Sequence, residues 1–187
     1  MRFWGISPQR LWQERNDMLE VLRKRRSIRK FKKDRIDPAR LEDLKEAVLR
    51  SPSSRGIKPW KFFFVQDPEV IQRLSLCKEH GSSFLKDAPL AVVVCGDETA
   101  SDVWIEDCSI AALILHLTAE SLGLGGCWIQ IRNRRHNAEF TSEEYIKKVL
   151  ALAGPLRVLA IVAIGLPSEV KTGRPFESLD HNKVVLV

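Results

Sequence analysis

The segment from about residue 102 to residue 122 is apolar on nearly all sides when it is read as a helix. Apolar residues at helical spacing mark one face (Trp104, Cys108, Ala111, Leu115, Leu122) and much of the rest (Ile110, Leu113, Ile114, Leu117). A helix of this kind is buried on several sides. In a chain of 187 residues, it lies either at the centre of the domain or at a subunit interface.

Apolar runs typical of strands alternate with capped helices along the rest of the chain. The sequence predicts strands at 60–65, 90–95, 127–131, 157–164 and, at the terminus, 184–187. Aspartate followed by proline opens helices 38–50 and 68–76, and the pair Thr141 and Glu144 forms a capping box for a helix to about residue 152. The pattern predicts an α+β fold with a sheet covered by helices.

The composition is that of an ordinary globular protein, with 44% hydrophobic and 29% charged residues. No apolar stretch approaches the roughly 20 residues that cross a bilayer, and no signal peptide is evident, so a cytoplasmic location is expected. The four cysteines show no C-x-x-C spacing and predict neither a zinc site nor disulfides. We expect residues 1–17 to be an N-terminal extension and residues 18–187 to form a single domain.

Positive charge is concentrated in residues 23–33, where eight of eleven residues are Lys or Arg, whereas the whole chain carries +6. Such a run is either a solvated surface, a nucleic-acid contact or a phosphate site. An extended backbone after residue 25 would place Arg25, Ser27 and Arg29 on one side and Ile28 toward the core. Two guanidinium groups and a hydroxyl that converge in this way favour a phosphate clamp.

Four motifs, in order along the chain, resemble those of the FMN-dependent nitroreductase family. They are residues 25–31 (RRSIRKF), 51–60 (SPSSRGIKPW), 104–109 (WIEDCS) continuing to 123–128 (GLGGCW), and 164–167 (IGLP). The resemblance extends from about residue 18 to the C-terminus. It implies a central, mostly antiparallel sheet flanked by helices, and an intertwined homodimer with two FMN sites at its interface. Helix 102–122 would then pack both in the core and against its twin.

The resemblance also implies roles for particular residues. Arg25, Arg26, Ser27 and Arg29 would hold the FMN phosphate, ribityl chain and pyrimidine edge. Pro52, Ser53 and Ser54 would reach the flavin of the other subunit. Cys127, Trp128 and Ile129 would supply backbone near flavin N5, and Lys171 and Arg174 a late basic contact to the phosphate. No catalytic side chain and no metal ligand is expected.

The chain departs from the family pattern in two places. Gly56 and Lys58 replace the Asn and Gln that the second motif often carries, so any amide contact from these side chains to flavin is lost. The excursion that covers the substrate in larger relatives is reduced to about residues 132–137. The basic residues there (Arg132, Arg134, Arg135 and His136) are either solvated or line the substrate mouth. His116 is interpreted as a core or interface histidine, Glu106 and Asp107 as a helix start, and Cys127 as an inert thiol.

The implied function is transfer of reducing equivalents from NAD(P)H through flavin N5 to an electron-poor small molecule such as a nitroaromatic, quinone or enone. The alternatives are a non-catalytic flavin-binding or regulatory protein, and a dehalogenase-type or flavin-fragmenting relative on the same fold. Neither a nucleic-acid nor a membrane partner is expected.

Overall fold

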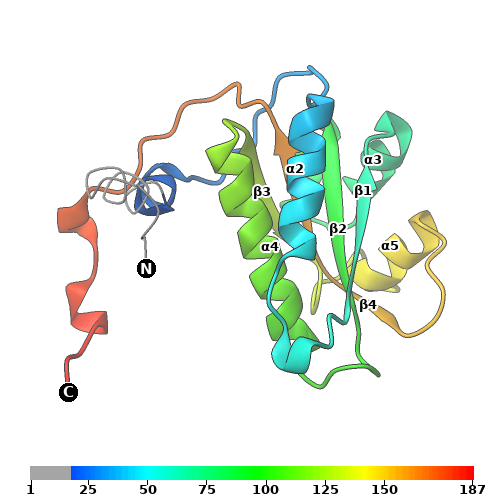
Figure 1. The fold of residues 1–187 in the computed structure, drawn as a ribbon. Helices are drawn as coiled ribbons and strands as arrows, with labels where there is room; N and C mark the ends of the chain where they lie inside the picture. Colours follow the sequence, from blue (N-terminus) through cyan, green and yellow to red (C-terminus); the bar gives the residue numbers. More distant parts are fainter. Residues whose placement is uncertain (1–17) are drawn as a thin grey trace, which may run out of the picture.

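The computed structural model describes residues 18–187 and contains a four-stranded antiparallel sheet (Figure 1). The strands are β1 (Trp60–Val65), β2 (Leu90–Asp97), β3 (Gly125–Gln130) and β4 (Leu156–Gly165), in the spatial order β1-β2-β4-β3. The central pair β2 and β4 is in register at Val93 and Ile161, and the register shifts between Val94 and Cys95. β3 is therefore an edge strand, paired on one side only with β4.

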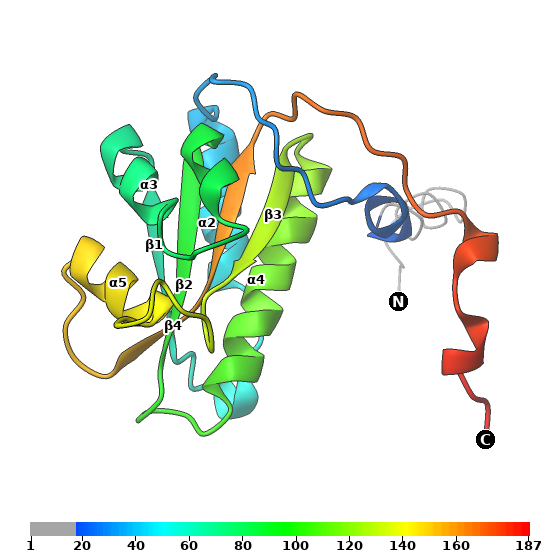
Figure 2. The same ribbon diagram turned by 180° about the vertical axis from the view of Figure 1, so that it is seen from behind.

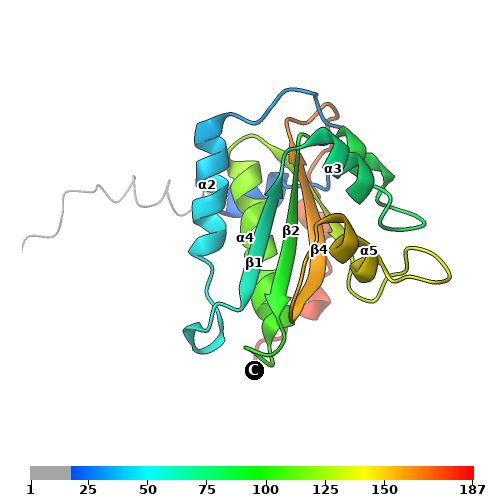
Figure 3. The same ribbon diagram turned by 90° about the vertical axis from the view of Figure 1, so that its right-hand side faces the viewer.

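Helices cover both faces of the sheet (Figure 3). α2 (Pro38–Leu49) and α4 (Trp104–Ser121) lie on one face, and α3 (Pro68–Leu74) and α5 (Ser142–Val149) lie on the other. Short 3-10 turns occur at Ser54–Gly56, Ser83–Asp87, Phe176–Ser178 and His181–Lys183. This arrangement confirms the predicted α+β class with a mostly antiparallel sheet.

The helices begin at the capping residues that the sequence predicted. The carboxylate of Asp37 accepts the N–H of Ala39, and that of Asp67 accepts the N–H of Glu69, each ahead of a proline in the first turn. Thr141 and Glu144 form the reciprocal capping box. Each cap satisfies backbone donors that the helix itself leaves unpaired.

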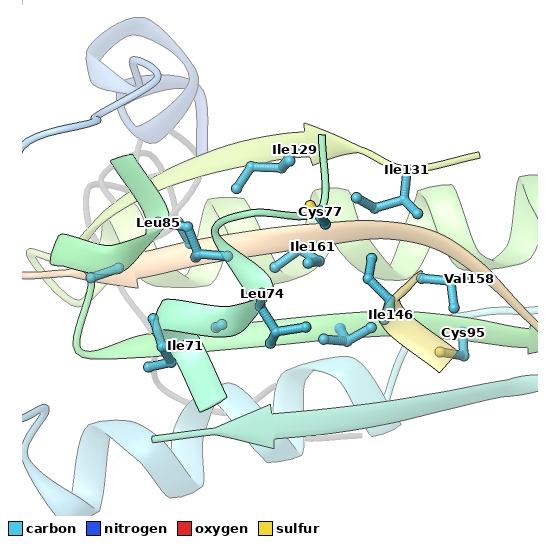
Figure 4. Packing of buried hydrophobic residues seen from close by; sticks show 14 of the residues in the cluster. Ile71, Leu74, Cys77, Leu85, Cys95, Ile129, Ile131, Ile146, Val158 and Ile161 are labelled. Carbon is cyan, nitrogen blue, oxygen red and sulfur yellow. The ribbon is translucent and has the colours of Figure 1, made fainter. Parts of the chain in front are cut away.

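Successive residues of each strand point to opposite faces of the sheet and so contribute to two apolar layers, one on each face. Figure 4 shows the layer beneath α3 and α5, where Ile71 and Leu74 from α3 and Ile146 from α5 meet Ile161 of β4. The other layer joins α2 and α4 to the sheet and contains Leu44, Val48, Leu115 and Val162 among its members.

α4 buries only part of its apolar surface within the chain. Its sheet-facing side includes Cys108, Ala112 and Leu115, which are fully buried. Ile110 and Leu113 are 42% and 52% exposed. The helix is thus central to the fold and still presents an uncovered apolar strip. Among residues 18–187, no helix is long and apolar enough to cross a membrane.

The two ends of the described chain lie away from the sheet. The sequence also predicts a short helix that starts at Met18 after an N-cap at Asn16 and Asp17. Residues 18–24 are helical, and the two capping residues fall outside the described residues. The chain that follows β4 leaves the sheet and passes toward this helix (Figures 1 and 2). The predicted strand at 184–187 is wrong: these residues are exposed and irregular, because no neighbouring strand of residues 18–187 pairs with them.

Candidate functional site

The basic segment 25–31 adds an extended stretch beside the edge strand β3. Arg25 closes the preceding helix by donating its N–H to the carbonyl of Val21, and the next residues extend. Ser27 bridges Gly126 in parallel, and the N–H of Ile28 donates to the carbonyl of Gly126 at 3.0 Å. A Cβ on Gly125 would fall 2.8 Å from the Cβ of Ile28, so glycine permits this approach. Ile28 is buried, which confirms its predicted inward orientation.

A cleft of about 630 Å³ opens on the outer side of this segment. Its described lining comprises Leu19, Leu22, Arg23, Arg25, Arg26, Ser27, Arg29, Lys171, Arg174 and Leu179. Six of these residues are Lys or Arg, and none of the described lining residues is acidic. The cleft thus brings together the four residues predicted from the first motif and the two late basic residues predicted after β4. A concentration of cationic donors of this kind suits an anionic ligand.

The loop after β4 holds the rim of this cleft. The ammonium of Lys171 donates to the carbonyl of Ser27 at 2.6 Å, and the guanidinium of Arg26 donates to the carbonyl of Thr172 at 2.6 Å. Glu169 accepts the backbone N–H of Arg29 at 2.6 Å. The partners in these three contacts are 140, 144 and 146 residues apart in the sequence, so the contacts join two distant segments of the chain.

A second hollow of about 380 Å³ shares Arg25 and Ser27 with the basic cleft. Ser109, Leu113 and His116 of α4 and Trp128 of β3 complete its lining. Trp128 therefore lies in a hollow that adjoins the cationic cleft, and its predicted backbone approach to flavin N5 stays a prediction. The sequence gives no signal that Ser109 and Leu113 line a site, because their positions on an apolar helix are typical of packing residues.

His116 is a polar residue of this hollow, and its sequence context predicts a core or interface histidine. It is buried, and its Nε2 atom has no hydrogen-bond partner among residues 18–187. Burial, together with the charge of Arg25, lowers the pKa of His116 to about 4. The imidazole is therefore neutral at pH 7 and lies beside a cationic cleft without adding charge to it.

The other two residues predicted on β3 have buried side chains. Ile129 belongs to the apolar layer under α3 and α5, and Cys127 is also buried. Burial raises the pKa of the Cys127 thiol despite the nearby charges of Arg29 and Lys171, which supports its interpretation as inert. The predicted contribution of Cys127 and Ile129 through their backbone stays a prediction.

Pro52, Ser53 and Ser54 lie at the other end of α4 and do not line the basic cleft. The N–H of Ser54 donates to Asp107 near the start of α4, and the hydroxyl of Ser53 accepts the N–H of Lys58 at 2.9 Å. Arg55, Gly56 and Lys58 have positive φ angles of 55°, 67° and 55°, so this is a tightly wound loop. Its predicted contact with the flavin of another subunit stays a prediction.

The second basic cluster is largely engaged within its own loop. The guanidinium of Arg135 donates to the carbonyls of Asn137 and Ala138, and His136 stacks on Tyr145 with 4.0 Å between ring centroids. None of the four residues lines the cleft or the adjoining hollow. These contacts favour a structural role. No cluster of metal-ligating side chains occurs in the described part of the chain, residues 18–187.

The edge strand, the N-terminal segment and the late loop of this α+β fold combine in a strongly cationic cleft, which suits a phosphorylated ligand. A model of the nitroreductase family matches residues 22–77 and 75–166. The chain belongs to the nitroreductase family, and the family and fold predicted from the four motifs are confirmed. The expectation of an oxidoreductase is confirmed at the level of this family.

Individual relatives agree with this assignment. A solved structure of an FMN-dependent nitroreductase from Clostridium difficile R20291 is 41% identical, with a TM-score of 0.88, and the match covers 90% of this chain and 98% of that one. Two archaeal proteins named "Putative NADH dehydrogenase/NAD(P)H nitroreductase" are each 29% identical. The one from Methanothermobacter thermautotrophicus matches over 82% of this chain and 78% of its own length, and the one from Archaeoglobus fulgidus over 83% and 88%.

Proposed function

We propose that this protein is a homodimeric, FMN-dependent oxidoreductase that passes reducing equivalents from NAD(P)H to an electron-poor small molecule. The observation that carries the proposal is the cleft with six cationic side chains and no acidic one among its described lining residues. The 41% identity to a protein named as an FMN-dependent nitroreductase supports the choice of FMN.

The donor set fits the phosphate of FMN. Arginine presents planar paired donors that match phosphate oxygens, and the Ser27 hydroxyl adds a further donor. Arg25, Arg29, Lys171 and Arg174 would hold the phosphate end, since they converge on the cleft from two segments. A volume of about 630 Å³ is within the usual range for a cofactor site.

The adjoining hollow supports a place for the remainder of the cofactor. It continues from Arg25 and Ser27 to Trp128 and the outer side of α4. FMN supplies the electron-transfer chemistry at N5, so the chain needs no nucleophile of its own. Trp128 and Leu113 would exclude water from one side of this hollow, and the neutral His116 would add no competing charge.

The homodimer is proposed from the uncovered strip on α4. Ile110 and Leu113 face away from the sheet and expose apolar surface that a second copy would cover. Dimerisation along α4 would also bring the Pro52–Ser54 loop of one copy toward the other copy's cleft, which a single chain does not achieve. The acceptor is proposed to be a nitroaromatic, a quinone or an enone.

The proposal is tested by purifying the protein, adding FMN and separating free flavin by gel filtration. We expect flavin absorbance to remain with the protein, at one FMN per chain in a dimer. Steady-state NAD(P)H oxidation with a quinone then distinguishes an enzyme from a non-catalytic flavin binder. A protein that retains no flavin after FMN addition would refute the proposed function.

A further inference from the structure

Glu169 is an acidic residue that contacts both segments lining the cationic cleft without lining the cleft itself. A single oxygen, Oε1, accepts the backbone N–H of Arg29 at 2.6 Å and that of Lys30 at 3.1 Å. The same oxygen lies 3.2 Å from the ammonium of Lys171. The Glu169 and Lys171 side chains are only 19% and 29% exposed, so the carboxylate is held in place by both segments.

The position of Glu169 is unexpected from its negative charge. A carboxylate near a phosphate site opposes phosphate binding, because like charges repel. Glu169 is nevertheless bound to three donors and is absent from the cleft's described lining. Glu169 contacts the Lys171 side chain and the backbone of the segment that lines the cleft. Such contacts are typical of a residue that positions the binding residues and does not itself touch the ligand.

The partners of Lys171 and its neighbours complete this arrangement. The ammonium of Lys171 also donates to the Ser27 carbonyl at 2.6 Å, so it is fixed between Glu169 and the first motif. Arg26 donates to the carbonyl of Thr172. A Cβ on Gly173 would collide with the carbonyl oxygen of Arg23, so only glycine allows the loop to lie this close. The loop 169–173 is therefore joined to segment 23–30 at several points.

We infer that Glu169 is a positioning residue that pre-assembles the phosphate clamp, by holding Lys171 and the backbone of Arg29 and Lys30 in the geometry that receives the phosphate. This inference rests on the proposed function. The hydrogen bond from the N–H of Arg29 and the ion pair with Lys171 lower the pKa of Glu169, so the carboxylate is ionised at neutral pH. Pre-organised donors bind more tightly, because their ordering precedes ligand binding.

The test compares FMN with riboflavin, which lacks the phosphate. Equilibrium titrations give the ratio of the two affinities for the wild type, Glu169→Ala, Glu169→Gln and Glu177→Ala. Glu177 is an exposed carboxylate in the same C-terminal segment and serves as the matched control. Glu169→Ala is expected to weaken FMN binding roughly tenfold, as for loss of hydrogen bonds to a charged group, and to leave riboflavin binding unchanged.

Glu169→Gln retains an oxygen acceptor for the two backbone donors and loses the ion pair, so its loss of FMN affinity is expected to be smaller. Combining Glu169→Ala with Lys171→Ala should cost less FMN affinity than the sum of the two single effects, because Glu169 acts in part through Lys171, and the part that remains reports its hold on the backbone of Arg29 and Lys30. Thermal unfolding midpoints identify any variant that fails to fold, and Glu169→Gln then carries the comparison.

Three outcomes would overturn the inference. An FMN affinity that is unchanged or increased in Glu169→Ala, with riboflavin binding also unchanged, would show that the carboxylate acts only by its charge or not at all. An equal loss for both ligands would show a merely structural role. A wild type that binds neither ligand would refute the proposed function and this role with it, and is distinguished from the first two outcomes by the wild-type titration alone.

Discussion

The carboxylate of Asp107, in the first turn of α4, accepts the backbone N–H of Ser54 at 2.8 Å across 53 residues of sequence. Asp107 is buried, and its second carboxylate oxygen, Oδ2, has no partner within residues 18–187. A buried acid thus fixes the Pro52–Ser54 loop to the helix that carries the uncovered apolar strip. The position of this loop and that of α4 are therefore coupled.

Replacing Asp107 should destabilise the protein. Asp107→Ala leaves the N–H of Ser54 without its acceptor, and we expect a loss of about 1–3 kcal/mol in the free energy of unfolding, measured by urea denaturation. Glu106→Ala, at an exposed neighbouring position, is the control and should change stability little. Equal effects of the two substitutions would contradict a structural role for the Asp107–Ser54 contact.

Only part of the basic run should matter for cofactor binding. Arg25 lines both the cleft and the adjoining hollow, whereas the side chain of Lys32 is exposed and lines neither. Arg25→Ala should weaken FMN binding by about 2–5 kcal/mol, as for loss of one partner of a charge pair. Lys32→Ala should leave the affinity unchanged. Fluorescence titration measures both, and an Arg25→Ala variant with wild-type affinity would remove this residue from the proposed site.

The sequence predicted most of the fold because its local signals agree with tertiary packing. β1 spans Trp60–Val65 as predicted, since Pro59 and the Asp67 cap bound the apolar run on both sides. α4 begins and ends within two residues of the prediction. The error at 184–187 has a physical cause: β-branched residues favour a strand, but a strand also needs a partner, and Val185 and Leu186 are exposed.

The site was predicted less completely because several of its members act through distant contacts. His116 lies on an apolar helix and reads as a core residue until Arg25 and the β3 glycines are placed beside it. Glu169 acts on backbone N–H groups, which leave no trace in side-chain motifs. Pro52–Ser54 lie outside the cleft of their own chain, and their proposed contact with flavin requires a second copy. The boundary between an extension and a domain at residue 18 stays a prediction.

The uncovered strip on α4 leads to a prediction about assembly. Ile110→Glu places a charge where the proposed dimer buries apolar surface, and an unpaired buried charge is costly. We expect analytical ultracentrifugation to show a shift from dimer to monomer, with loss of FMN because the other copy's Pro52–Ser54 loop is removed.

The matched control for this variant is Leu49→Glu, which alters an exposed apolar residue of α2 and should leave a dimer that binds FMN. An Ile110→Glu protein that sediments as a wild-type dimer would show that the interface lies elsewhere. A monomer that keeps full FMN affinity would instead refute the shared site.

His116 should make stability depend on pH. Its pKa is about 4 in the folded protein, because burial and the charge of Arg25 oppose protonation, and about 6.5 in the unfolded chain. Between these two pKa values the unfolded state binds the proton more readily than the folded state does. The contribution of His116 to the free energy of unfolding is therefore fully present above pH 6.5 and is lost as the pH falls toward 4. The loss expected from His116 alone is about 2 kcal/mol at pH 5 relative to pH 7.

Urea denaturation of the wild type and of His116→Leu at pH 7 and pH 5 measures this contribution as the difference between their pH dependences, since the other titrating groups are common to both proteins. His80→Leu is the control, because His80 is exposed, and it should retain the wild-type dependence. If His116→Leu loses as much stability at pH 5 as the wild type does, the imidazole is protonated at its ordinary pH and is in contact with solvent.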